Sequence, residues 1–365
     1  MSVPRAYAFR VDLPREPGLV EADLDDLTTN ARPPSEDALH IAPPKALWTK
    51  VAKPVPGLLF TGALPPENRA RFLLRVPRDW NGRLVVGAAS GITDETTYDL
   101  YFSDYLVSRG YAFAATDKGV RRAVIDGDTV VMPMTPESSV RRWAGRLETL
   151  VETARELILR RMGASPERVY AVGLSNGGFV ARRAAELGFV DGAVEISGVL
   201  WRADKGNLMR ELPALLRDGF PGVDAKWKPL EDLYRLVYWE SSLGVFVSDL
   251  DPSYQGALVD YDLDTRPAAL AVIKEFENTG DLKAPLISIS GRHDFLIPCA
   301  GHAEAYRDLV RSRGKADLHR LVFEENAAHI DTNAEAFPFV TPLMPRAHAA
   351  FDELVSWVEK AKVSA

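Results

Sequence analysis

The sequence predicts an α/β fold in which helices flank a mostly parallel β-sheet. From Ala70 onward, short β-branched and aliphatic runs alternate with segments whose apolar residues recur at three- and four-residue steps. Strands that alternate with amphipathic helices are joined by crossovers, which make neighbouring strands parallel. Most runs are apolar throughout rather than at every second position, which indicates strands buried on both faces.

These apolar runs predict the strands of the sheet, and one long amphipathic segment predicts its clearest helix. The helix is expected from Pro136 to Met162, because Thr135 can cap it and Gly163 can end it. Its apolar stripe, which includes Trp143 and Leu147, is expected to pack on the sheet. The predicted strands are Arg71 to Val76, Arg83 to Ala88, Tyr111 to Ala115, Arg168 to Leu174, Gly192 to Ser197, Leu286 to Ser290 and Leu318 to Phe323.

Two segments depart from the alternation. Residues 1–56 are rich in Pro, Asp and Glu and lack a sustained period, so we expect an irregular N-terminal arm. Residues 201–283 are too long for a plain loop and contain helical patterns. We expect them to form a large helical cap, or lid, inserted into a core made of residues 57–200 and 284–365. The cap is rich in aromatic residues, which in an insertion more often form a small core than a substrate pocket.

Composition narrows the possible partners and locations. The 365 residues are 46% hydrophobic and 26% charged, as in ordinary globular proteins. A net charge of −7 argues against nucleic-acid binding, which needs clustered positive charge. The one cysteine, Cys299, excludes an intramolecular disulfide and a multi-cysteine metal site. Without a secretory signal or an apolar run of ~18 residues, a cytoplasmic protein with no membrane partner is expected.

A G-x-S-x-G sequence, Gly173 to Gly177, lies between a predicted strand and a helical pattern. Such a sharp turn exposes the serine hydroxyl above the sheet, and its small neighbours tolerate the strained backbone. Ser175 is therefore the predicted nucleophile, and the backbone N–H of Asn176 is expected to face the oxyanion. The alternative is a glycine-rich packing turn with an incidental serine.

Chain order indicates which histidine serves this serine. In the fold that uses this turn, the acid and then the histidine follow the serine along the chain. Of six histidines, His329 alone follows the last predicted strand in a loop of small residues. It is the predicted general base, the alternative being a loop histidine that only hydrogen-bonds its neighbours.

The predicted acid is Asp294, just beyond the strand that ends at Ser290. A carboxylate there would accept the imidazole Nδ1 proton and stabilise the imidazolium. Asp331 is the competing candidate, because it lies close to His329 in sequence; otherwise it would be a surface loop charge.

The second oxyanion donor is expected in the small-residue loop after the strand that ends at Ala88. The candidates are the backbone N–H groups of Ser90, Gly91 and Ile92. A plain turn is the alternative. No metal or organic cofactor is implied by these residues.

Several strings resemble those of bacterial α/β-hydrolases related to tannases, feruloyl esterases and 3-hydroxybutyrate oligomer hydrolases. They are residues 77–86, 109–112, 115–119, 173–178 and 278–280, and the similarity spans roughly Arg71 to Lys360. The resemblance implies an α/β-hydrolase fold and hydrolysis of a carboxylic ester under a large lid. Two features depart from it. Leu174 and Ile330 stand where the secreted members carry paired cysteines, and the loop after Ala88 lacks the common His-Gly pattern.

Together, these features predict a serine carboxylesterase acting on an aromatic or hydroxyalkanoate-type ester, either small or oligomeric. Two alternatives remain open. The same triad could serve a cofactor-free lyase or perhydrolase, or the fold could be a catalytically silent ligand-binding module.

Overall fold

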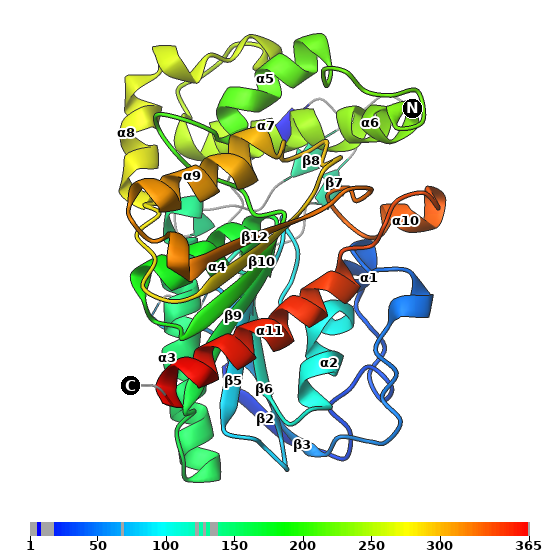
Figure 1. Cartoon of the computed structure of the whole chain (residues 1–365), viewed down its shortest axis with the longest axis vertical. Coiled ribbons are helices and arrows are strands. Elements are labelled where there is room, and N and C mark those ends of the chain that lie inside the picture. Colours follow the sequence, from blue (N-terminus) through cyan, green and yellow to red (C-terminus); the bar gives the residue numbers. More distant parts are fainter. Residues whose placement is uncertain are drawn as a thin grey trace.

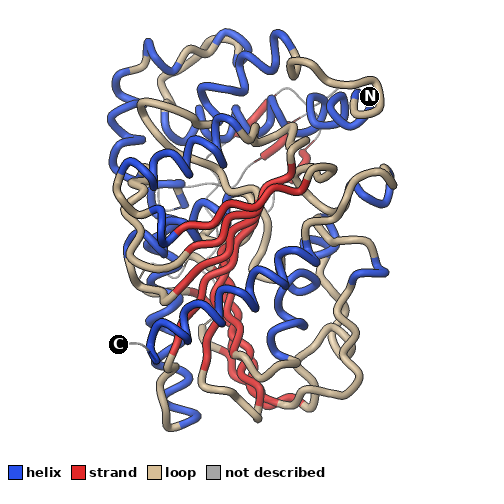
Figure 2. Tube along the Cα trace, in the orientation of Figure 1, coloured by secondary structure: helices blue, strands red, loops and turns tan. Residues whose placement is uncertain are grey.

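The computed structural model describes residues 6–8, 18–66, 69–120, 124–126, 129–131 and 138–363. Its centre is a nine-stranded twisted sheet in the order β12-β11-β10-β9-β5-β6-β4-β3-β2 (Figures 1 and 2). The strands are β2 (Val20–Leu24), β3 (Gly57–Ala63), β4 (Arg71–Pro77), β5 (Arg83–Ala88), β6 (Ala112–Thr116), β9 (Arg168–Leu174), β10 (Gly192–Ile196), β11 (Leu286–Gly291) and β12 (His319–Glu324). A small second sheet contains β1 (Ala6–Ala8), β8 (Thr129–Val131) and β7 (Val124–Asp126).

The strands from β6 to β12 across the sheet are parallel, and the β4, β3 and β2 edge is antiparallel. All seven predicted strands are present, and β5 and β9 have the predicted bounds. The expectation that residues 1–56 are irregular is wrong for β2, which pairs with β3. Because β2 is an edge strand with Val20 54% exposed, it has no continuous apolar run to reveal it.

Helices cover both faces of the sheet (Figure 1). Val86 packs in one buried cluster with α3 and α4, whereas its neighbour Val85 packs in another with α2 and α11. This alternation follows from the pleat of a strand buried on both faces. In the described part of the chain, the α-helices outside the segment between β10 and β11 are α1 (Glu36–His40), α2 (Asp104–Val107), α3 (Trp143–Met162), α4 (Asn176–Leu187), α9 (Ala305–Ser312), α10 (Asn333–Ala336) and α11 (Met344–Val363).

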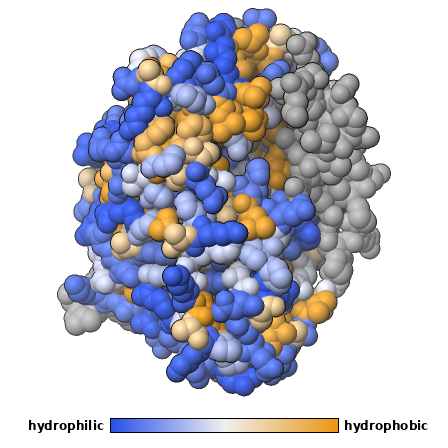
Figure 3. Space-filling view, turned by 90° about the vertical axis from the view of Figure 1, so that its right-hand side faces the viewer, coloured by the Kyte–Doolittle hydropathy of each residue, from blue (hydrophilic) through white to orange (hydrophobic). Residues whose placement is uncertain are grey.

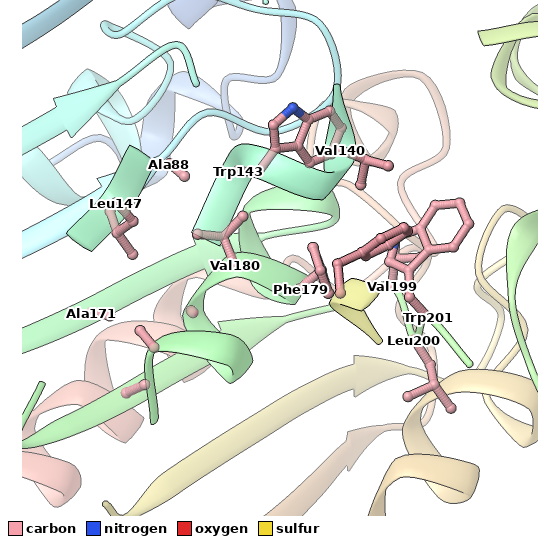
Figure 4. Close-up of a cluster of buried hydrophobic side chains, with 14 of the residues drawn as sticks. Ala88, Val140, Trp143, Leu147, Ala171, Phe179, Val180, Val199, Leu200 and Trp201 are labelled. Atoms are coloured by element: carbon pink, nitrogen blue, oxygen red, sulfur yellow. The ribbon is translucent and has the colours of Figure 1, made fainter. Parts of the chain in front are cut away.

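The long helix α3 begins at Trp143, after a 3₁₀ turn at Val140–Arg142, and ends at Gly163 in a left-handed conformation (φ 73°). The predicted start at Thr135 and Pro136 lies outside the described residues. The predicted apolar stripe is buried, and Figure 4 shows Trp143 and Leu147 in the cluster that α4 completes with Phe179 and Val180.

The segment between β10 and β11 is helical, as predicted. It contains α5 (Leu208–Asp218), α6 (Lys228–Tyr234), α7 (Glu240–Leu250) and α8 (Pro267–Phe276), which lie at the top of Figure 1. Trp201 packs edge-on against Phe246 and Phe276, with ring centroids 4.8 and 5.6 Å away. Phe246 and Phe276 also pack edge-on against Trp143 of α3 and Phe179 of α4, with ring centroids 6.4 and 6.1 Å apart, so these rings join the insertion to the sheet domain.

The face shown in Figure 3 mixes hydrophilic and hydrophobic residues, with the hydrophobic ones gathered mainly in its upper part. Within the described part of the chain, every helix is too short or too polar to cross a membrane.

Candidate active site

Ser175 occupies the turn between β9 and α4, with φ 59° and ψ −118°. This left-handed backbone is rare for a residue with a side chain and is held by tight packing. A Cβ on Gly173 would collide with the Gly177 carbonyl, and one on Gly177 would collide with the Ala88 carbonyl and the Tyr98 hydroxyl. The glycines of the motif therefore permit the turn and bring α4 against the end of β5.

Ser175, His329 and Asp294 form one hydrogen-bonded chain. His329 Nε2 lies 3.0 Å from Ser175 Oγ, and His329 Nδ1 lies 2.7 Å from Asp294 Oδ2. All three side chains are buried, and Ser175 is 7% exposed. An Nδ1 proton shared with the carboxylate leaves Nε2 free to accept the serine proton.

The Asp294 carboxylate is held from its other side. Its Oδ1 accepts hydrogen bonds from the backbone N–H groups of Leu296, at 2.9 Å, and Ile297, at 2.7 Å. Only Oδ2 faces the imidazole, so the loop after β11 fixes the direction of the carboxylate.

Asp331, the competing acid, has different partners. Its two oxygens accept from the backbone N–H groups of Leu343 and Met344, at 2.7 and 2.8 Å, where α11 begins. Burial raises the pKa of this carboxyl to about 6. The geometry makes Asp331 a cap for α11 rather than a partner of His329.

The loop after β5 offers free N–H groups near the serine. Ala89 N–H donates to the Thr116 carbonyl at 2.9 Å. Among the described residues, the N–H groups of Ser90 and Gly91 have no hydrogen-bond acceptor, and neither does that of Asn176, the first residue of α4. These are the predicted oxyanion donors, and the structure leaves them unpaired.

Tyr98 is a site residue that the sequence did not reveal. Its buried hydroxyl donates to the Ala88 carbonyl at 2.7 Å and accepts from Leu174 N–H at 2.9 Å. Burial raises its pKa, so the phenol remains protonated. One side chain thus ties the end of β5 to the residue before Ser175.

The insertion also contacts the loops that carry the acid and the histidine. Trp227 stacks on His293 with ring centroids 3.8 Å apart, and Trp239 Nε1 donates to the Phe295 carbonyl at 2.6 Å. The Tyr234 ring lies edge-on to His329, with centroids 6.5 Å apart. Trp227 and Trp239 thus contact the two residues that flank Asp294, and Tyr234 lies beside the imidazole of His329. The sequence did not predict this position for Tyr234.

A cavity of about 370 Å³ lies beside β12 and α9. Arg292, Arg307 and Arg311 line it, but each forms an ion pair with a neighbouring carboxylate. Neither Ser175 nor His329 contributes to its walls.

Solved structures share this fold. An esterase from Aspergillus oryzae is 13% identical, with 96% of this chain and 88% of that chain covered and a TM-score of 0.58. A variant of the rice cell wall degrading esterase LipA from Xanthomonas oryzae is 13% identical, with coverages of 93% and 98% and a TM-score of 0.52. Acylaminoacyl peptidase from Pyrococcus horikoshii is 13% identical and covers 80% of this chain, with a TM-score of 0.50. This chain spans only 40% of that peptidase.

Comparison with protein families finds no match, and neither does comparison with curated protein sequences. The structural likeness and the sheet order define an α/β-hydrolase fold, as predicted from the sequence.

Proposed function

We propose that this protein is a serine hydrolase that cleaves carboxylic esters through an acyl-enzyme. The observation that carries the proposal is the hydrogen-bonded chain from Ser175 Oγ through His329 to Asp294. Two further features support it. The serine sits in a strained turn at a helix N-terminus, and unpaired backbone N–H groups lie on the neighbouring loop.

In the proposed reaction, Ser175 Oγ attacks the ester carbonyl while His329 Nε2 takes the serine proton. The carbonyl electron pair becomes an oxyanion, which the N–H groups of Asn176 and of Ser90 or Gly91 stabilise. Collapse breaks the bond to the alcohol, which leaves with the proton from His329. Water then attacks the acyl-enzyme by the same steps, and Asp294 stabilises the imidazolium in both halves.

For the substrate, we propose an ester with an aromatic or hydroxyalkanoate group, small or oligomeric. The support is the sequence resemblance to tannase-like and feruloyl esterase-like hydrolases. We further propose that residues 201–283 cover the site as a cap, since α6 carries Tyr234 to the edge of His329. The same triad could transfer the acyl group to peroxide or act as a lyase, and analysis of the products separates these reactions.

The test is reaction with a fluorophosphonate probe together with hydrolysis of p-nitrophenyl esters of short aliphatic, aromatic and hydroxyalkanoate acids. Wild type should be labelled and should hydrolyse at least one ester. Ser175→Ala should lose labelling and ~10⁴-fold or more of kcat. Ser197→Ala is the matched control, because this serine follows the next strand, is buried and also has a positive φ of 47°. Labelling that survives in Ser175→Ala, or a wild type that is not labelled, would contradict the proposal.

A further inference from the structure

The Thr116-Asp117-Lys118-Gly119 turn carries part of the sequence resemblance but has no place in the proposed triad. It follows β6, which pairs in parallel with β5, so the turn lies beside the loop that supplies Ser90 and Gly91. Lys118 has a left-handed backbone (φ 63°) and a side chain that is wholly buried. A buried lysine in a strained turn is costly and needs polar partners.

The partners of Lys118 are carbonyl groups of the oxyanion loop. Its Nζ donates to the Ala89 carbonyl and, at 3.3 Å, to the Gly91 carbonyl. The centroid of the Trp143 ring lies 5.0 Å from Nζ, within the range of a cation–π contact. No carboxylate among the described residues pairs with this Nζ.

The Ser90 carbonyl between these two is also held. Thr93 Oγ1 donates to it at 2.5 Å. In a trans peptide unit, the C=O and the N–H of the next residue point in opposite directions. Holding the carbonyls of Ala89, Ser90 and Gly91 therefore directs the N–H groups of Ser90, Gly91 and Ile92 the other way.

We propose that Lys118 is a positioning residue for the oxyanion hole: it binds the Ala89 and Gly91 carbonyls and so aims and polarises the N–H donors of this loop. The proposal rests on the proposed ester hydrolysis. Hydrogen bonds in one chain of peptide units strengthen each other, so a donor on the carbonyl makes the attached N–H a better donor.

The turn itself is built to hold this lysine. The Asp117 carboxylate accepts from Gly119 N–H at 2.7 Å and from Arg71 N–H at 2.9 Å, and Lys118 N–H donates to Thr116 Oγ1 at 3.1 Å. Burial lowers the pKa of Lys118 to about 7, which the negative charge of Asp117 opposes. A neutral amine still has two N–H hydrogens, enough for two carbonyls, so both protonation states can hold the loop.

The experiment compares Lys118→Met with Lys45→Met. Both changes replace a lysine amine by an unbranched apolar side chain, and Lys45 also lies over a tryptophan ring, Trp48, but on the exposed surface of the arm. The readouts are kcat and KM for p-nitrophenyl acetate, the rate of fluorophosphonate labelling, and the inhibition constant of a trifluoromethyl ketone. That ketone adds to the serine and places a charged oxygen in the oxyanion hole.

Lys118→Met should lose ~10²–10³-fold in kcat and a similar factor in affinity for the ketone, with KM changed by less than about threefold. If Lys118 only stabilised the fold, its replacement would not lower the affinity for the ketone while leaving KM nearly unchanged. Values of kcat and ketone affinity within about threefold of Lys45→Met would overturn the proposal, and so would a loss confined to KM.

If Lys118→Met does not fold, Thr93→Val tests the premise of the proposal, that a donor bound to a carbonyl of this loop aims the next N–H. This change keeps the shape of the side chain and removes the hydrogen bond to the Ser90 carbonyl together with the contact to Thr97 Oγ1. Thr93→Val should lower the affinity for the ketone by a larger factor than it changes KM for the substrate. An unchanged affinity for the ketone would overturn the proposal. Unchanged ketone affinity in a protein that still labels at Ser175 rejects only the role of Lys118. A wild type that neither labels nor hydrolyses esters rejects the proposed function as well.

Discussion

Replacing Asp294 by asparagine should convert the imidazole of His329 to the wrong tautomer while preserving the shape of the site. Leu296 and Ile297 both donate backbone N–H groups to Oδ1, so the amide oxygen must take that position. The amide NH₂ then faces His329 Nδ1, 2.7 Å away in the native site. Nδ1 becomes an acceptor, the proton moves to Nε2, and Nε2 cannot take the Ser175 proton.

An asparagine at the orienting position of a serine protease costs ~10⁴-fold in kcat, or about 5 kcal/mol of transition-state stabilisation. We expect a loss of that order for Asp294→Asn. Asp331→Asn is the matched control, because it makes the same change in a buried loop aspartate that contacts Leu343 and Met344 instead. It should alter stability and leave kcat within about threefold of wild type.

The assay is steady-state hydrolysis of the best p-nitrophenyl ester, with thermal unfolding of each variant measured in parallel. A larger loss of kcat in Asp331→Asn than in Asp294→Asn would refute the assignment of the acid. An Asp294→Asn protein that retains more than about a tenth of wild-type kcat would refute the tautomer argument.

Three further predictions follow from the contacts around the site. Tyr98→Phe should lower the unfolding free energy, measured by urea titration, by ~1–3 kcal/mol and should lower kcat, because the buried Ala88 carbonyl and Leu174 N–H lose their partner. Unchanged stability and kcat would contradict this. Trp227→Ala should lower the unfolding free energy by ~3–5 kcal/mol and lower kcat for short and bulky esters by the same factor, because the ring packs on His293 beside Asp294. A changed ratio of kcat between bulky and short esters, with an unchanged melting temperature, would instead indicate that the ring lines the substrate pocket. Burial raises the pKa of Asp331 to about 6, so the folded state still holds a proton that the unfolded state releases near pH 4. The unfolding free energy of wild type relative to Asp331→Asn should therefore fall by roughly 2 kcal/mol from pH 4 to 6, and a rise over that interval would contradict the burial argument.

The parts of the site that lie within one strand–turn–helix unit could be predicted from the sequence. The run from Arg168 to Gly178 contains the strand, the glycines and the serine in consecutive order. Asp294 and His329 could be predicted because each follows a recognisable strand, the buried β11 and the partly exposed edge strand β12, and parallel strands end at the same edge of a sheet. The structure brings these three side chains together, and their chemical roles remain the proposal.

The supporting residues could not be predicted, because their roles depend on contacts between distant segments. Tyr234 is 95 residues from His329, and Lys118 is 29 residues from Ala89. A tyrosine at the end of a helix or a lysine in a turn has no local pattern that shows whether its side chain is buried against another segment or lies on the surface. The aromatic residues of the insertion were recognised, but only the structure shows that Trp227 and Trp239 pack against the acid loop.

The proposed mechanism is tested most directly by trapping the acyl-enzyme and locating it. Wild type is mixed with an excess of a p-nitrophenyl ester, quenched in acid within the first turnovers, digested and examined by mass spectrometry. Ester hydrolysis through an acyl-enzyme at Ser175 should give a mass increase equal to the acyl group on the peptide that contains Ser175, and no such increase in Ser175→Ala. Continued turnover with the acyl group on another residue, or with no acylated peptide and no burst of p-nitrophenol, would contradict it.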